Sequence, residues 1–289
     1  MDEWEVIARA RERFPVRGGS RVIGIGDDAA VVGERLLSTE LFVEGVHFDR
    51  GWMNWDTIGR RCTEIVLSDI AAMGGTVDGL LVGFSGTLGS DEINLLLDGI
   101  SSAEVPVLGG DTVGGGGECG VVLAMTVLGN AKRPVLRKGA QAGDVVYVSG
   151  ALGGVLAGQK LLERGRRDSP LVERFLAPRA RLDLASFWGR SASAMIDISD
   201  GLSSELWHIA GDSRVRIEIE SVRIPIFEGV ETVFENPIEA ALSSGEELEL
   251  LATAPVPLLE GKEIGCVKEG EGVFLDGTLL RRSGFTHRW

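Results

Sequence analysis

The chain of 289 residues carries 43 Asp and Glu against 29 Lys and Arg, a formal net charge of −14 at pH 7. Such a balance argues against nonspecific binding to nucleic acid or to an anionic membrane surface. No apolar run approaches the ~20 residues that a membrane span needs, and the acidic start MDEWE does not resemble a secretory signal. The three cysteines are scattered, which is typical of reduced thiols, so we expect a cytoplasmic protein.

The first half of the chain is predicted to mix strands and helices. Apolar residues at helical spacing predict helices over 2–14, 56–73 and 91–103, the last with Ser90 as its N-cap. Short apolar runs predict strands over 22–25, 35–43, 80–84, 105–108 and 121–128. The fourth of these strands is expected to run into a loop at Gly109-Gly110-Asp111.

A domain boundary is predicted near 130–143, where turn formers and basic residues cluster. Beyond it we expect further strands, beginning with 144–148 and 194–198, and helices over 151–163, 171–189, 201–210 and 237–242. Neither half shows regular strand–helix alternation, so the pattern favours α+β over a doubly wound sheet. The sequence therefore predicts two α+β domains, 1–135 and 136–289, with a cleft between them.

Four acidic segments stand out because their carboxylates lie beside Gly, Ala and Ser and next to apolar runs. They are 26–30, 68–74, 109–112 and 197–201. Any one Asp of this kind has an ordinary alternative as a helix cap or turn residue. Four such segments in one chain favour a shared role, and open carboxylate clusters suit Mg²⁺ that carries phosphates.

Asp69 is the most informative of these acids. In the predicted helix 56–73 it shares the apolar face with Ile58, Cys62 and Met73. An unpaired carboxylate on a buried face is costly. Asp69 is therefore expected to face a cation or a basic partner.

Familiar catalytic signatures are missing from the sequence. The run 153–160 reads GGVLAGQK, in which Gln159 breaks the Walker pattern, and no His-Arg-Asp or Asp-Phe-Gly motif occurs. Gly24 and Gly26 lack the third glycine of a dinucleotide fingerprint. Three histidines and unpaired cysteines make a zinc site improbable, and there is no Gly-x-Ser-x-Gly elbow. No covalent nucleophile is predicted.

Taken together, the motifs resemble an ATP-dependent superfamily that includes aminoimidazole ribonucleotide synthetase, selenophosphate synthetase and a hydrogenase maturation enzyme. Within it the sequence is most similar to the thiamine-monophosphate kinase family. The resembling stretches are IGIGDDAAVV (23–32), LSTELFVEGVHF (37–48), LSDIAAMGG (67–75), LGGDT (108–112), SGALGG (149–154), DISDGL (197–202), SSGEELEL (243–250) and GFTH (284–287). The resemblance implies an N-terminal domain that dimerises through its sheet, and ATP with Mg²⁺ bound between the two domains.

The resemblance also implies roles for individual residues. Mg²⁺ ligands would be Asp28, Ser38, Thr39, Glu40, Asp69, Asp111, Asp197 and Asp200. ATP contacts would be Gly110, Asp111, Arg137 and Ser199, and thiamine monophosphate contacts would be His47, Glu246 and Phe285. Without the resemblance, His47 is equally an ordinary strand histidine and Arg137 a solvated linker charge.

The chain departs from the family pattern at five positions. Glu40, Glu205 and Gly154 each stand where the family has Asp. Glu247 and Leu248 replace Asp and Tyr. These departures bear on the geometry of one metal ion and on part of the substrate pocket.

The expected function is therefore transfer of the γ-phosphoryl group of ATP to thiamine monophosphate by a cytoplasmic homodimer. Two alternatives stay open at this level. One is an ATP-dependent enzyme of the same superfamily with another acceptor, although the N-terminal Cys of selenophosphate synthetase and the terminal Cys of the hydrogenase maturation enzyme are both missing. The other is a noncatalytic descendant that binds nucleotide or Mg²⁺; turnover distinguishes it from an enzyme.

Overall fold

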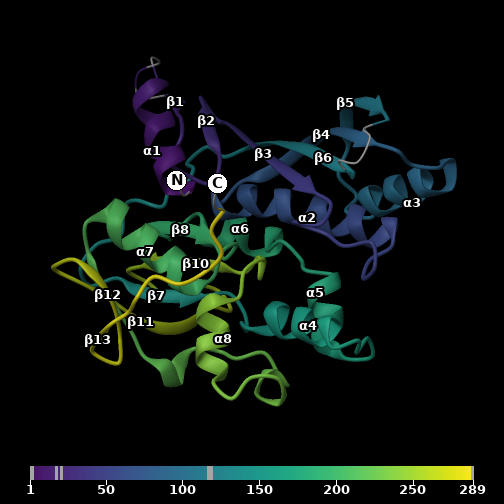
Figure 1. Cartoon of the computed structure of the whole chain (residues 1–289). Coiled ribbons are helices and arrows are strands. Elements are labelled where there is room, and N and C mark those ends of the chain that lie inside the picture. Colours follow the sequence, from purple (N-terminus) through teal and green to yellow (C-terminus); the bar gives the residue numbers. More distant parts are fainter. Residues whose placement is uncertain (1–2, 17–18, 20–21, 116–119, 288–289) are drawn as a thin grey trace.

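The computed structural model describes residues 3–16, 19, 22–115 and 120–287. Its strands form two separate sheets, one of six strands and one of seven. Figure 1 shows the two sheets stacked one above the other, with helices of both halves between and around them. The two described chain ends lie close together, where the Glu3 N–H donates to the carbonyl of His287 at 3.2 Å.

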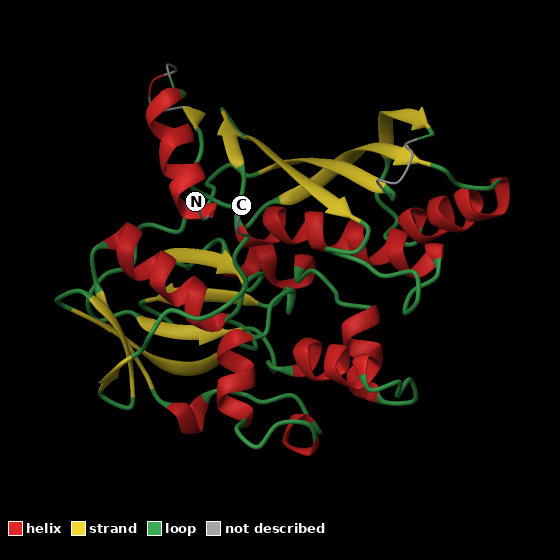
Figure 2. Cartoon of the chain, viewed as in Figure 1, coloured by secondary structure: helices red, strands yellow, loops and turns green. Residues whose placement is uncertain are grey.

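The N-terminal sheet is mixed and carries its helices on one face. Its strands are β1 (Val22–Ile23), β2 (Ala30–Val32), β3 (Arg35–Val43), β4 (Thr76–Gly86), β5 (Val107–Gly114) and β6 (Val122–Asn130). Their order is β1-β2-β3-β6-β4-β5, and only β4 and β5 run parallel among these pairs. Figure 2 shows α2 (Trp55–Ala72) and α3 (Ser90–Ser101) along one face of this sheet, and α1 (Glu3–Arg13) beside its β1 end.

The central strand β6 shows why the sheet has two unlike faces. Leu123, Met125 and Val127 are buried, while the residues between them are only half-buried. Successive side chains of a strand point to opposite faces, so the buried set faces α2 and the other set faces outward. The pairing register puts Ser38 and Glu40 of β3 on the α2 face as well, because they lie opposite Val127 and Met125.

Helix α2 positions the site from the N-terminal side. The Asn54 side chain accepts from the backbone N–H of Thr57 at 2.8 Å, which caps the helix start. The helix ends before Gly74, whose φ of +68° lies in the left-handed region. A Cβ on Gly74 would lie 2.9 Å from the Cα of Gly189, so glycine allows α2 to end against the other half of the chain.

The C-terminal sheet has the order β13-β12-β9-β11-β7-β10-β8 and is antiparallel except for the pair β9 and β12. Its strands are β7 (Val145–Val148), β8 (Ala194–Asp197), β9 (Arg216–Ile219), β10 (Leu250–Ala254), β11 (Lys262–Lys268), β12 (Gly272–Leu275) and β13 (Thr278–Leu279). The α-helices of this half are α4 (Gly154–Glu163), α5 (Pro170–Leu176), α6 (Leu182–Trp188), α7 (Leu202–Ser213) and α8 (Pro237–Ser243). Two short 3₁₀ helices, η2 (Ser221–Arg223) and η3 (Val230–Thr232), complete it.

The two halves share buried apolar surface. Leu171 and Phe175 of α5 belong to the same core cluster as the N-terminal sheet. A second shared cluster joins Ala71 and Ala72 of α2 with Trp188 of α6. This packing holds α2 against both halves, so groups on α2 can face a site between them. The α+β prediction is confirmed, and the boundary predicted at 135/136, in the segment joining β6 to β7, stays a prediction.

Several element predictions were wrong in the N-terminal half. The strand predicted over 105–108 is in fact β5 at Val107–Gly114, so Gly110 and Asp111 lie within a strand because they pair in parallel with β4. The α3 N-cap is Gly89 rather than Ser90, and its N–H donates to the Glu92 side chain at 2.8 Å. The strand predicted over 22–25 is only two residues long, and β2 was not predicted.

The predicted helix 171–189 is also wrong, since the structure has two helices there. Helix α5 ends at Leu176 and α6 begins at Leu182. Pro178 lies between them, and proline disfavours the helical conformation of the residue before it and cannot donate a backbone hydrogen bond. None of the helices in the described parts of the chain combines the length and apolar character that a membrane crossing requires.

Candidate active site

A large cavity lies where the two halves meet, with a volume of about 1220 Å³. It is lined by residues of α1, β3 and α2 from the N-terminal half, and of α4, α5, α7 and the segment after β8 from the C-terminal half. Pockets for one small molecule are typically 300–1,000 Å³. This cavity therefore has room for two ligands side by side.

The N-terminal half contributes carboxylates from three places. Asp27 and Asp28 lie in the turn between β1 and β2, Glu40 lies on β3, and Asp69 lies on α2. Strand β2 pairs only with residues 35–37 of β3, so it leaves the edge of β3 beyond that point to the cavity. The Ser38 hydroxyl bonds to the Asp69 carboxylate there and lowers its pKa, although burial outweighs this effect.

The C-terminal half contributes Asp197, Ser199 and Asp200 from the end of β8 and the turn after it, and Glu205 from α7. The Ser68 hydroxyl of α2 donates to Asp197 Oδ2 at 2.6 Å, which joins the two halves at the floor of the cavity. Glu205 Oε1 accepts from the Asp200 N–H at 3.0 Å and so orders the turn.

The carboxylates are held close together with little water around them. Burial raises the pKa of Asp27, Glu40 and Asp197 to about 7, and that of Asp200 to about 6. Neighbouring acids add to the effect: Asp28 for Asp27 and Asp197, Asp200 for Glu40, and Glu3 for Asp200. Burial, and then Glu40 and Asp197, raise the pKa of Asp69 well above its ordinary value. The cavity thus concentrates negative charge that a cation would stabilise.

Arg137 is the basic residue that reaches this cluster from the segment joining the two sheets. Its backbone N–H donates to Asp27 Oδ1 at 3.2 Å, and its guanidinium contacts Asp28. Burial raises the pKa of Asp28, and Arg137 opposes that rise. One buried oxygen of Asp28 and one of Asp69, Oδ2 in each case, find no hydrogen-bond partner within the described residues.

These oxygens fit Mg²⁺, which prefers hard oxygen ligands. The described residues contain no preformed group of three or more acidic, His or Cys side chains in metal-binding arrangement. Mg²⁺ that arrives with substrate phosphates needs only one or two protein carboxylates and keeps several waters. Asp28 and Asp69, with their unpartnered oxygens, are the residues best placed to hold it.

Aromatic rings line the cavity next to Asp200, whose backbone carbonyl accepts the N–H of Phe285 at 3.1 Å. The His47 and His287 rings lie 5.5 Å apart between centroids, and Phe285 meets His287 edge-on at 4.8 Å. His47 Nδ1 accepts the N–H of Val43 at 3.0 Å, which places the proton of the neutral ring on Nε2. Burial lowers the pKa of His47, while Glu246 opposes the effect. The ring is therefore expected to be neutral at pH 7.

Three of the predicted residues lie apart from this cluster within one chain. The Thr39 hydroxyl is 2.9 Å from the Thr126 hydroxyl, on the outer face of the sheet, so Thr39 can present only its backbone to the cavity. Asp111 and Gly110 lie on β5, which is exposed along its whole length, and they do not line the cavity. The register places Asp111 in one row with Gly83, Ala124 and Leu41, again on the outer face.

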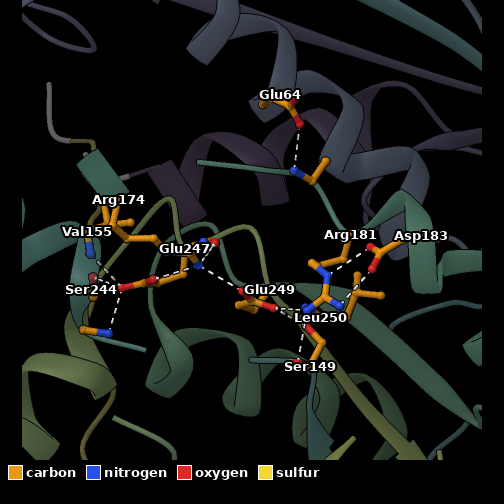
Figure 3. Close-up of polar contacts among 12 residues, drawn as sticks. Glu64, Ser149, Val155, Arg174, Arg181, Asp183, Ser244, Glu247, Glu249 and Leu250 are labelled. Carbon is orange, nitrogen blue, oxygen red and sulfur yellow. Dashed lines mark hydrogen bonds and ion pairs between the residues drawn. The ribbon is translucent and has the colours of Figure 1, made fainter. Parts of the chain in front are cut away.

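Three departures from the family pattern are not part of the cavity lining. Figure 3 shows the polar contacts of one of them, Glu247. The Glu247 carboxylate accepts the N–H groups of Gly153 and Val155 at 2.7 and 3.2 Å, at the start of α4. A Cβ on Gly154 would lie 2.8 Å from the Phe227 ring, so that space is already filled. Leu248 is fully buried. These residues support the cavity wall.

Sequence reasoning missed several cavity residues. Asp27 and His287 line the cavity and lie inside the motifs at 26–30 and 284–287, so adjacency to Asp28 and to Phe285 is a usable signal for them. Arg61, His208 and Arg282 carried no signal, because a lone basic residue on a helix or near a chain end is usually solvated. Of these, Arg61 lies beside the cavity and contacts Glu246.

Comparison with known proteins identifies the class. A family described as AIR synthase related protein, N-terminal domain, matches residues 26–131, and the corresponding C-terminal domain matches residues 141–271. The fold is shared with a hydrogenase maturation protein HypE, at a TM-score of 0.71 and 18% identity. The two sheets and the acidic cavity between them are thus those of an AIR synthase related protein.

Within that class, the chain belongs to the thiamine-monophosphate kinase family. It is 35% identical to thiamine-monophosphate kinase of Aquifex aeolicus over 286 residues, covering 91% of this chain and 92% of that protein. Identity to the Pyrococcus abyssi protein is 36% over 291 residues, covering 95% and 91%. A solved structure described as AaThiL complexed with AMPPCP and TMP matches with a TM-score of 0.90 and 33% identity, covering 99% and 97% of the two chains.

Proposed function

We propose that this chain transfers the γ-phosphoryl group of ATP directly to the phosphate of thiamine monophosphate and so forms thiamine diphosphate. One observation carries the proposal: in a member of the thiamine-monophosphate kinase family, a cavity large enough for two ligands is lined both by carboxylates and by aromatic rings. The relative described as complexed with AMPPCP and TMP supports the same pair of substrates.

The carboxylates that line the cavity suit phosphates and the cations that accompany them. Phosphoryl transfer needs positioning and charge neutralisation more than covalent help from the protein. Mg²⁺ bound there would neutralise the charge that develops during transfer. In this proposal Asp28, Glu40 and Asp69 hold the metal from the N-terminal half, Asp197 and Asp200 hold it from the other half, and Ser38 orients Asp69.

Arg137 and Ser199 are proposed as ATP contacts. Both residues line the cavity beside the carboxylates. Arg137 holds Asp27 through its backbone N–H and Asp28 through its side chain. His47 and Phe285 also line the cavity and would contact the rings of thiamine monophosphate. The thiazolium ring of that molecule is a cation, which aromatic faces and carboxylates attract. Glu246 would supply the carboxylate.

A homodimer is part of the proposal. The outer face of the N-terminal sheet exposes Leu41, Leu81 and Val113, and a second copy would cover them. Asp111 lies on this face and Gly110 precedes it on the same exposed strand, so in such a dimer they would serve the partner's site rather than their own. A reducing cytoplasm is the proposed setting, in keeping with the free thiols of Cys62 and Cys266.

The test is turnover with product identification. Pure protein is incubated with Mg-ATP and a panel of thiamine and purine intermediates, and any phosphorylated product is identified by mass. Thiamine diphosphate formed only in the presence of Mg²⁺ is the expected result. Phosphorylation of another acceptor would reassign the substrate, and ATP binding without any product would indicate a noncatalytic protein.

A further inference from the structure

Arg61 is a buried cation that the proposed chemistry does not use. Its side chain is only 1% exposed, although it lies on α2 next to Arg60, which is 44% exposed and pairs with Asp56 at 3.0 Å. A buried guanidinium is costly unless it is paired and hydrogen-bonded. The contacts that offset this cost show what Arg61 holds.

The hydrogen-bond partners of the Arg61 guanidinium among the described residues come from the C-terminal half. Nη1 donates to the backbone carbonyl of Phe175 at the end of α5, and Nη2 donates to Glu246 Oε2. The guanidinium also lies 4.3 Å from the centre of the Phe175 ring. Arg61 on α2 therefore forms an ion pair with Glu246, a residue that lines the cavity from the C-terminal half.

The backbone of Glu246 is fixed from the other side. Glu246 and Leu248 have φ values of +53° and +55°, which are strained for residues with side chains. Their N–H groups donate to the carbonyls of Ser199 and Ile198 at 2.7 and 3.1 Å. Between them the Glu247 carboxylate is buried against the start of α4, as Figure 3 shows. The turn thus aims the Glu246 side chain away from its own domain.

We infer that Arg61 is a positioning residue for the acceptor site: it holds Glu246 by one oxygen and leaves the other to meet the cation of the acceptor. The Glu246 side chain is 31% exposed and lines the cavity, so its carboxylate can reach a ligand. A side chain that is fixed at its backbone and at one carboxylate oxygen needs little reordering when a cationic ring binds. This inference rests on the proposed function, because it concerns the binding of thiamine monophosphate in the same cavity.

Loss of the Arg61 side chain is expected to weaken the binding of thiamine monophosphate but not the binding of ATP. Arg61→Met in the full-length protein should raise the KM for thiamine monophosphate by about 10- to 100-fold, because the substitution removes one charge-assisted hydrogen bond to Glu246. The KM for ATP should stay within about 2-fold, because the contacts of Arg61 are to Phe175 and Glu246 and not to Arg137 or the proposed metal ligands. Arg61→Lys, which keeps the charge and one contact, should recover part of the acceptor affinity. Arg60→Met is the matched control and should behave as the parent.

A double-mutant cycle tests whether Arg61 acts through Glu246. Glu246→Gln, which keeps the shape of a partly exposed side chain, should fold and should also weaken thiamine monophosphate binding. In that background Arg61→Met should add little further loss. Losses that multiply in the double variant, an equal rise in the KM for ATP, or an unchanged KM in Glu246→Gln would each overturn the inference. A parent protein that neither binds nor phosphorylates thiamine monophosphate would instead refute the proposed function, and the inference with it.

Discussion

Arg137 donates both Nε and Nη2 to one and the same oxygen of Asp28, at 3.0 and 2.5 Å. The other oxygen of that carboxylate is buried and finds no hydrogen-bond partner in the part of the chain that the structure describes. An unsatisfied buried acceptor is unfavourable. The arrangement therefore presents an oxygen that is ready for a cation, while Arg137 fixes the orientation of the carboxylate.

Asp69→Asn should abolish most activity without harming the fold. We expect product formation to fall by at least about 100-fold, because the loss of a metal ligand removes transition-state charge stabilisation. Burial and the neighbouring Glu40 and Asp197 all oppose ionisation of Asp69, so the melting temperature of the metal-free variant should equal or exceed that of the parent. Asp78→Asn, which alters a surface partner of Arg35, is the control. Near-parent turnover in Asp69→Asn would refute the assignment.

The metal-free protein should become less stable as pH rises. Asp27, Glu40 and Asp197 have pKa values raised to about 7, whereas carboxylates in an unfolded chain titrate at about 4. Between these values the folded state binds more protons than the unfolded state, so the free energy of unfolding falls as pH rises through that window. With a chelator present, melting should therefore occur at a lower temperature at about pH 8 than at about pH 5.5.

Saturating Mg²⁺ should remove most of that difference, since a bound cation stabilises the ionised cluster. Circular dichroism melts at the two pH values, with and without Mg²⁺, make the comparison. A metal-free protein that melts at the same or a higher temperature at the upper pH would show that the carboxylates are not held protonated by burial.

The substitution at Glu40 can be tested by metal titration. Glu40 lies on the α2 face of β3, where its pKa is raised by burial and by Asp200, so it faces the cluster rather than solvent. Glu40→Gln should raise the Mg²⁺ concentration needed for half-maximal activity, and Glu40→Asp should be tolerated, because Mg²⁺ accepts a shorter carboxylate or a water in its place. Parent-like titration of both variants would remove Glu40 from the ligand set.

The transfer is expected to be direct. No residue in the cavity has a motif for an activated nucleophile, and the buried Cys62 is inert because burial raises its pKa far above its ordinary value. A chiral γ-phosphate on ATP should therefore emerge with inverted configuration. Net retention, or an isolable phosphoenzyme, would show that a side chain of the protein carries the phosphoryl group.

Light scattering at micromolar concentration should give about twice the chain mass of 30.8 kDa. Leu41→Glu, which places a charge on the 57%-exposed Leu41 of the outer sheet face, should shift the protein toward monomer. Val222→Glu, at an 88%-exposed position of the other half, is the control and should not. A parent protein that is monomeric and fully active would contradict the proposed dimer.

Mixed dimers test whether Asp111 serves the partner. When Asp111→Asn and Asp69→Asn chains are combined, a mixed dimer regains one intact site if the two residues act in different subunits. Activity should then reappear on mixing, although each variant alone is inactive. No recovery from a verified mixed dimer would place Asp111 outside the partner's site.

Much of the local structure was predictable from the sequence alone. The period of apolar residues predicted α2 and placed Asp69 on its apolar face, and the apolar run at 121–128 predicted the strand β6. The acidic motifs indicated the kind of chemistry, because carboxylates beside small residues suit metal-bound phosphates. These properties depend on residues close together in the chain, so a sequence pattern can carry them.

Only the tertiary structure decided which residues meet. Ser68 and Asp197, or Arg61 and Glu246, are brought together by packing between the two halves, and no local pattern encodes such a contact. Strand register likewise placed Glu40 toward the cavity, while Asp111, a member of an equally clear motif, lies on the outer face. A side chain's face depends on pairing with distant strands, and its pKa on burial by distant elements, so both follow from the fold rather than from the motif.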